Sequence, residues 1–110
     1  MRHFAIAALM VMAASSASAA TPVCADDATK QAKKLLSFHM GEGFEKYMAF
    51  EAPKPKASLK NPANPKQIFQ VLEVEGFVDP SGRYRMRFIY YPSPQSCLLM
   101  GQEILEIANL

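Results

Sequence analysis

Three arginines alternate along one stretch of this chain and are its clearest candidates for binding chemistry. Arg83, Arg85 and Arg87 are separated by single apolar residues, so an extended strand places all three guanidinium groups on one face. Guanidinium groups bind carboxylates and phosphates through paired hydrogen bonds. The pattern predicts a surface for an anionic partner, with Phe77 exposed among the arginines. The alternative is a solvated face on which neighbouring acids neutralise the arginines.

Residues suited to catalysis are few. Beyond the first twenty residues His39 is the single histidine, and with Glu42 or Glu45 it would form the base of a small hydrolase. Glu73 and Glu75 share a strand face, but a flat face offers no cleft to raise the pKa of one carboxyl group. The serines lie in expected turns and loops and form no Gly-x-Ser-x-Gly motif. We predict no catalytic residues and a protein that is not an enzyme, with the hydrolase as the alternative.

Metal and cofactor motifs are equally sparse. His39 and Met40 with Met48 would suit soft copper chemistry, but methionine more commonly fills a core, and a lone histidine lacks further ligands. The segment 41–43, Gly-Glu-Gly, lacks the rest of any phosphate-binding loop. We therefore predict no metal site and no cofactor.

The two cysteines, Cys24 and Cys97, are the whole cysteine complement of the chain. An even count in a small exported domain is typical of a disulfide. Their wide spacing does not fit a zinc knuckle or a redox motif. A bridge that closes so long a loop would stabilise the fold by roughly 4 kcal/mol.

The first twenty residues have the layout of a cleavable signal peptide. Arg2 and His3 precede an uncharged apolar run, residues 4–14, and small residues follow at 15–20. The apolar run is shorter than the roughly 20 residues that a membrane-spanning helix needs. Thr21, Pro22 and Val23 do not form a lipid-attachment signal before the first cysteine. We therefore expect a protein without a lipid anchor, in the periplasm or secreted.

Removal of the signal peptide leaves residues 21–110 as a single small domain, with eleven bases and ten acids. This near balance is not the excess of positive charge that nucleic-acid binding requires. The sequence contains no further apolar stretch long enough for a transmembrane segment. We therefore expect neither a nucleic-acid partner nor a membrane span, and the oligomeric state stays open.

The domain begins with a helix pattern. Apolar or small residues recur at three- and four-residue steps, and Gly41 follows as a stop signal; the stripe comprises Ala25, Ala28, Ala32, Leu35 and His39. Residues 44–50 fit a short helix or a strand, and both alternatives stay open. Residues 52–66 are rich in proline and lysine and are predicted to form an irregular, solvated loop.

The last third of the sequence alternates as strands do. A hairpin is predicted between residues 68–78 and 83–91, with Pro80, Ser81 and Gly82 as its loop. This register pairs Val78 with Tyr84 and requires a positive φ at Gly82. On the outer face it aligns acids or an aromatic with each arginine: Asp79 with Arg83, Phe77 with Arg85, and Glu75 with Arg87.

Residues 97–107 are predicted to form a further strand, with a helix as the alternative over 97–108. As a strand, its inward side would carry Cys97, Leu99, Gly101, Leu105 and Ile107. The predicted fold is α+β: an N-terminal helix packed on an antiparallel meander of three or four strands, stapled by one disulfide.

These features predict an exported, disulfide-stapled binding or accessory protein of the cell envelope that acts through its surface on a protein or polyanionic partner. Two alternatives stay open. One is the small hydrolase built on His39. The other is a structural envelope subunit that adds its edge strand to a partner.

Overall fold

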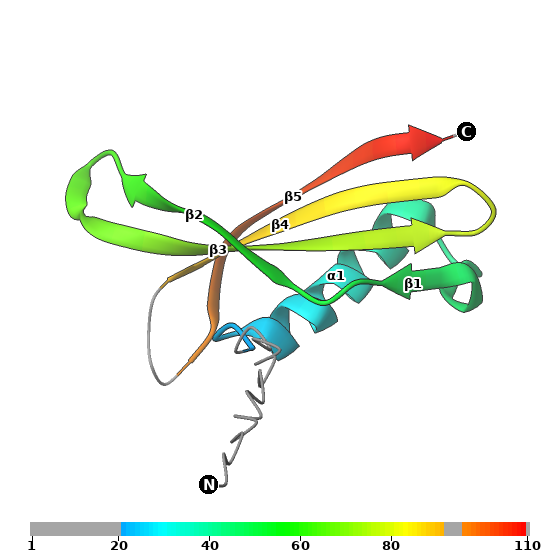
Figure 1. Ribbon diagram of the computed structural model, residues 1–110, viewed down its shortest axis with the longest axis horizontal. Coiled ribbons are helices and arrows are strands. Elements are labelled where there is room, and N and C mark those ends of the chain that lie inside the picture. Colours follow the sequence, from blue (N-terminus) through cyan, green and yellow to red (C-terminus); the bar gives the residue numbers. More distant parts are fainter. Residues whose placement is uncertain (1–20, 92–95, 110) are drawn as a thin grey trace, which may run out of the picture.

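A computed structural model describes residues 21–91 and 96–109 of the chain. One helix lies against one face of an antiparallel sheet, as predicted (Figure 1). The elements in chain order are helix α1 (Ala25–Met40), a 3-10 turn (Glu45–Tyr47), and strands β1 (Met48–Phe50), β2 (Lys54–Asn61), β3 (Asn64–Val78), β4 (Gly82–Tyr91) and β5 (Leu98–Asn109). The predicted signal peptide, residues 1–20, lies outside the described residues.

The sheet is organised around β3, the longest strand. Strand β4 pairs with one side of β3, and β5 pairs with β4. On the other side of β3, β1 pairs with the last residues of the strand and β2 pairs with residues 64–73. The predicted meander is therefore β3–β4–β5. The segment 44–50, left open above, is a 3-10 turn followed by the short strand β1.

Helix α1 packs its small residues against the sheet. Ala25, Ala28, Ala32 and Leu36 are buried, while Leu35 is only partly buried and His39 is exposed. The predicted stripe was therefore correct for its three alanines, but Leu36 takes the buried position that was predicted for Leu35. Gly41 ends the helix at a φ of 85°, a conformation that glycine adopts without a Cβ clash.

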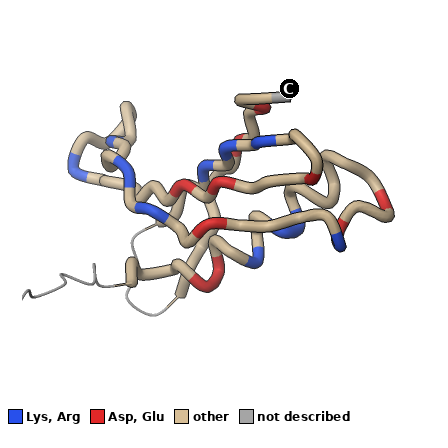
Figure 2. Tube along the Cα trace, turned by 45° about the vertical axis from the view of Figure 1, so that its right-hand side comes forward, with Lys and Arg blue, Asp and Glu red and all other residues tan. Residues whose placement is uncertain are grey.

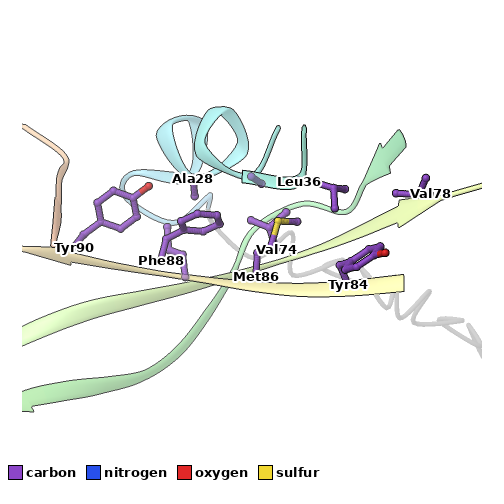
Figure 3. Close-up of a cluster of buried hydrophobic side chains, with 10 residues drawn as sticks. Ala28, Leu36, Val74, Val78, Tyr84, Met86, Phe88 and Tyr90 are labelled. Carbon is purple, nitrogen blue, oxygen red and sulfur yellow. The ribbon is translucent and has the colours of Figure 1, made fainter. Parts of the chain in front are cut away.

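The core lies between α1 and the strands β3 and β4 (Figure 3). Alternate residues of β4 point toward the helix, and Tyr84, Met86, Phe88 and Tyr90 are all buried. The hydroxyl of Tyr90 donates a hydrogen bond of 2.8 Å to Asp27 in the first turn of α1. This bond satisfies a polar group at the buried end of the core.

The predicted disulfide is present and ties the start of α1 to the residue before β5. The sulfur atoms of Cys24 and Cys97 are 2.11 Å apart. The loop that they close contains most of the sheet, so the bridge links the two ends of the fold.

The predicted hairpin between β3 and β4 is correct in its facing but wrong in its register. Val78 pairs with Gly82 and Gly76 with Tyr84, so each partner is shifted by two residues from the prediction. The loop is 79–81, it contains a cis Asp79–Pro80 peptide bond, and Gly82 does not have a positive φ. A two-residue shift leaves every side chain on its own face, so alternation cannot separate the two registers.

The predicted loop at 52–66 was wrong, because most of it forms β2 and the start of β3. Its prolines lie where a strand tolerates them. Pro53 precedes β2, Pro55 lies on an edge strand and Pro62 is in the turn between Asn61 and Asn64. Residues 54–60 are all exposed, so the expectation of a solvated segment was correct.

Strand β5 confirms the strand alternative for the last segment but not its predicted facing. Tyr90 pairs with Leu99 and Ile89 with Gly101, which leaves Met100 as an extra, bulged residue. The bulge reverses the alternation beyond it. Ile104 therefore packs against the core, whereas Leu105 and Ile107 are exposed.

Candidate partner-binding surface

The outer face of the sheet, on the side away from α1, carries the predicted arginines. The observed register places Phe77 opposite Arg83, Glu75 opposite Arg85 and Glu73 opposite Arg87. Each arginine therefore has a different neighbour from the one predicted. Strand alternation brings the three guanidinium groups onto one face as expected. The acids lie opposite Arg85 and Arg87, whereas the predicted register had them opposite Arg83 and Arg87.

A single buried carboxylate organises the middle of this face. Glu73 is only 6% exposed although its neighbours face solvent. Its carboxylate accepts a hydrogen bond of 3.1 Å from Nε of Arg87, and the Nζ of Lys56 lies 3.2 Å away. Burial raises the pKa of Glu73, but the hydrogen bonds and charges of Arg87 and Lys56 outweigh burial and hold that pKa below its ordinary value of 4.5.

Arg85 also turns toward Glu73. Its Nε lies 3.5 Å from the Glu73 carboxylate, and this atom is buried without a hydrogen-bond partner among the described residues. The predicted register placed Arg85 opposite Phe77, and that neighbour was wrong, because Glu75 lies opposite Arg85. Arg85 shares the carboxylate of Glu73 with Lys56 and Arg87, which both lie closer to it.

Arg83 is held separately at the end of the strand. Its guanidinium group donates a hydrogen bond of 2.8 Å to Glu75 and lies 5.8 Å from the centre of the Phe77 ring. Phe77 is thus among the arginines as predicted, but it is partly buried beneath Arg83. The ion pairs of this face form a charge network in two parts, Arg83 with Glu75 and the cluster around Glu73, instead of a row of free cations.

A groove crosses this face beside the network. Its volume is about 500 Å³, and it contains apolar residues from three strands together with three charged residues: Ala57, Leu59, Val71 and Ile89, with Lys56, Arg87 and Glu103. Sequence reasoning missed Lys56 as a neighbour of the arginines because β2 was taken for a loop. It missed Glu103 because the bulge at Met100 reverses the predicted facing of β5. Charged groups around an apolar floor are suited to binding an amphipathic polypeptide segment.

The residues considered for catalysis lie elsewhere. His39 is exposed on the last turn of α1, with its ring centre 5.3 Å from that of Tyr84. No hydrogen bond or ion pair joins His39 to Glu42 or Glu45 in the part of the chain that the structure describes. The geometry therefore offers no acid to orient the imidazole ring for the hydrolase alternative.

The residues considered for metal binding are part of the core packing. Met40 and Met48 both pack against the core, and Met40 accepts a hydrogen bond of 3.3 Å from the Tyr84 hydroxyl. Within residues 21–91 and 96–109, no group of three or more His, Cys, Asp or Glu side chains is placed to hold a metal ion.

A second cavity lies away from the arginines. Its volume is about 550 Å³, and it lies between the start of α1 and the segment that joins β1 to β2, where Pro22, Ala25, Pro53 and Pro55 line it. An ion pair of 3.6 Å between Glu51 and Lys54 borders it. Neither a histidine nor a cysteine lines its largely apolar walls.

Among the described residues, no helix has the length and apolar character needed to cross a membrane. The outer face of the sheet, with its charge network and groove, is the best-developed candidate site on the described surface. Comparison of the chain with protein-family models, with curated proteins and with solved structures finds no match.

Proposed function

We propose that this protein is a small binding protein of the cell envelope that engages a protein partner through the outer face of its sheet. The observation that carries the proposal is the groove, in which Lys56 and Arg87 lie beside Val71 and Ile89. Polar groups at the rim of an apolar floor are the usual composition of a protein-binding surface. Such a surface binds a partner without chemical change.

The charge pattern favours a protein over a polyanion as the partner. The cations of the outer face alternate with three carboxylates, those of Glu73, Glu75 and Glu103. A uniformly negative polymer would meet these acids wherever it met the arginines. A protein surface can place a carboxylate near Lys56 and an apolar or basic group near Glu103.

Export is part of the proposal. A disulfide is consistent with a location outside the reducing cytoplasm, and the bond between Cys24 and Cys97 is present. Residues 1–20 have the composition of a signal peptide. The two features together support a periplasmic or secreted protein.

Charge-neutralising variants at the rim of the groove test the proposal. Arg85 is a poor probe because its buried Nε faces Glu73, so a change there would disturb folding and binding together. Lys56 also contacts Glu73, but its side chain is 41% exposed and that of Glu103 is 54% exposed, so both are better probes than Arg85. An acidic partner should bind more weakly to Lys56→Gln and more strongly to Glu103→Gln.

The measurement is chemical cross-linking and affinity capture from the cells that produce the protein, followed by mass spectrometry. Lys33→Gln on the exposed side of α1 is the matched control. The proposal predicts one protein whose capture falls with Lys56→Gln, rises with Glu103→Gln and is unchanged with Lys33→Gln. If all three variants capture the same proteins in the same amounts, the groove is not the binding site.

A second candidate function is strand addition at β5. Within the described residues β5 pairs only with β4, and its exposed apolar side chains include Leu98, Met100, Leu105 and Ile107. The opposite edge is protected by the lysines and proline of β2, as edge strands commonly are. The asymmetry favours β5 as an edge that receives another strand.

Replacement of Leu105 by lysine separates this candidate from the first. If β5 receives a strand from another copy of the chain, light scattering of the purified protein should detect oligomers. The Leu105→Lys variant should then be monomeric. A monomer at every concentration tested would contradict self-pairing through β5. The capture experiment with Lys56→Gln does not depend on this result.

A further inference from the structure

The β2–β3 hairpin forms an arm that extends past the part of the sheet covered by α1 (Figure 1). Its strands are exposed along residues 54–60 and through most of 62–68. A two-stranded ribbon without a helix against it gains little stability from apolar burial. The arm is therefore a surface feature and contributes little to the core.

The charge of the arm is entirely positive. Residues 52–72 contain four lysines and no acid, and Figure 2 shows the hairpin with basic residues alone. Lys54 and Lys56, near the body, are neutralised by Glu51 at 3.6 Å and by Glu73 at 3.2 Å. Lys60 and Lys66, near the turn, have no ion pair within the described ranges. Positive charge is therefore left uncompensated at the far end of the arm.

Large apolar side chains are exposed beside these two lysines. Leu59 is 46% exposed, Ile68 is 45% exposed and Tyr91 is 39% exposed. Lysines and prolines on β2 are accounted for by the need to keep an edge strand from pairing. That need does not account for exposed leucine, isoleucine and tyrosine, which would promote association.

The apolar groups lie on both faces of the arm. Leu59 pairs with Phe69, and Lys60 pairs with Ile68 on the opposite face. A protein partner normally covers one continuous face. A bilayer surface can receive side chains from both faces of a narrow hairpin, because head groups surround the tip on every side.

We propose that the far end of the arm binds anionic phospholipids at a bilayer surface. Lys60 and Lys66 pair with the phosphate groups, while Leu59, Ile68 and Tyr91 enter the boundary between head groups and acyl chains. The protein thus rests on the membrane without crossing it. Lys60, Lys66 and Ile68 do not line the outer-face groove, whereas Leu59 also lines it.

Vesicle sedimentation tests the proposal with the disulfide-bonded protein. Vesicles of phosphatidylcholine with about one third phosphatidylglycerol should bind it, and vesicles of phosphatidylcholine alone should bind it far less. The double variant Lys60→Gln/Lys66→Gln should lower the partition coefficient by about 25-fold, roughly fivefold for each lysine near an anionic surface. The double variant Lys33→Gln/Lys34→Gln on α1 carries the same charge change and should bind as the original protein does.

Two further measurements complete the test. Ile68→Ser, outside the outer-face groove, should weaken binding while the salt dependence is kept, because the apolar contribution is separate from the ionic one. Soluble poly-glutamate should compete only weakly, since it offers charge without an apolar boundary. The proposal is overturned by equal binding to both vesicle types, by equal loss in the two double variants, by poly-glutamate binding as tight as vesicle binding, or by no vesicle binding at low salt.

Discussion

The Nε of Arg87 lies 3.1 Å from the carboxylate of Glu73, at the centre of the sheet face opposite α1. Lys56 and Arg85 approach the same carboxylate from either side, at 3.2 Å and 3.5 Å. Three cations therefore depend on one nearly buried acid. Glu73 holds together the surface that we propose as the binding site.

Replacement of Glu73 by glutamine should destabilise the fold by about 1–2 kcal/mol at neutral pH. Loss of one member of a buried ion pair typically costs about 3–5 kcal/mol, and partial exposure of the three cations reduces this cost. Urea denaturation measures the effect. Glu103→Gln is the control, because Glu103 lies 4.0 Å from Arg87 and is 54% exposed, so its loss should cost less than about 0.5 kcal/mol. Equal costs for the two variants would contradict the central role of Glu73.

The stability of the original protein and that of Glu73→Gln should depend differently on pH. The pKa of Glu73 is lower in the folded protein than its ordinary value of 4.5, so its ion pairs stabilise the fold above that pH. The stabilisation is lost as the pH falls through the lower, folded pKa. The difference in unfolding free energy between the original protein and Glu73→Gln should therefore be constant near neutrality and shrink below about pH 4.5. A difference that stays constant down to pH 2 would show that the charge of Glu73 is not its cause.

Glycine at position 76 lets α1 approach β3. A Cβ placed there would lie 2.9 Å from Cε of Met86 and 3.0 Å from Cδ2 of Leu36. Gly76→Val should destabilise the fold by about 1–3 kcal/mol through overpacking. Gly101→Val is the control, since a Cβ at Gly101 would meet only Ile89, at 3.6 Å. Thermal unfolding of both variants measures the effect. A larger loss of stability in Gly101→Val than in Gly76→Val would contradict this packing.

Reduction of the bond between Cys24 and Cys97 should cost about 4 kcal/mol of stability. The bond closes a loop of 73 residues, and its removal frees the unfolded chain more than the folded one. Urea denaturation with and without a reducing agent measures the difference. The double variant Cys24→Ser/Cys97→Ser should match the reduced protein, and its stability should not respond to the reducing agent. An unchanged midpoint after complete reduction would show that the bridge is not what stabilises the fold.

The exported protein should begin at Ala20 or Thr21 and should carry no lipid. Small residues precede these positions, and the sulfur of Cys24 is engaged in the disulfide. Intact-mass measurement of the protein recovered from outside the cytoplasm checks both points. A mass that includes residues 1–19, or a diacylglycerol adduct, would contradict the prediction.

Local patterns in the sequence were sufficient for the helix and for the facing of β3 and β4. Ala25, Ala28 and Ala32 recur at helical spacing, and residues 83–88 of β4 alternate between basic and apolar. Two features could not be read in this way. The hairpin register has two solutions that place the same residues on the same faces, and the bulge at Met100 leaves no local signal before Leu105 turns outward.

The candidate site was predictable only in part for the same reason. Alternation identified the arginine face, but the neighbours of each arginine depend on the register that was wrong by two residues. Lys56 reaches Glu73 only because β2 is a strand, and the prolines around Lys56 favoured a loop. Edge strands tolerate proline on the side that faces solvent, so proline content alone does not exclude a strand there.

Site-specific photo-cross-linking in the cells that produce the protein tests the proposed binding face most directly. A photoreactive amino acid at Glu103 would stand at the rim of the groove, and the same residue at Lys33 would stand on the exposed side of α1. Our account predicts a covalent adduct with one partner protein from position 103 and none from position 33. An adduct from position 33 alone, equal adducts from both positions, or no adduct from either would contradict binding through the outer face of the sheet.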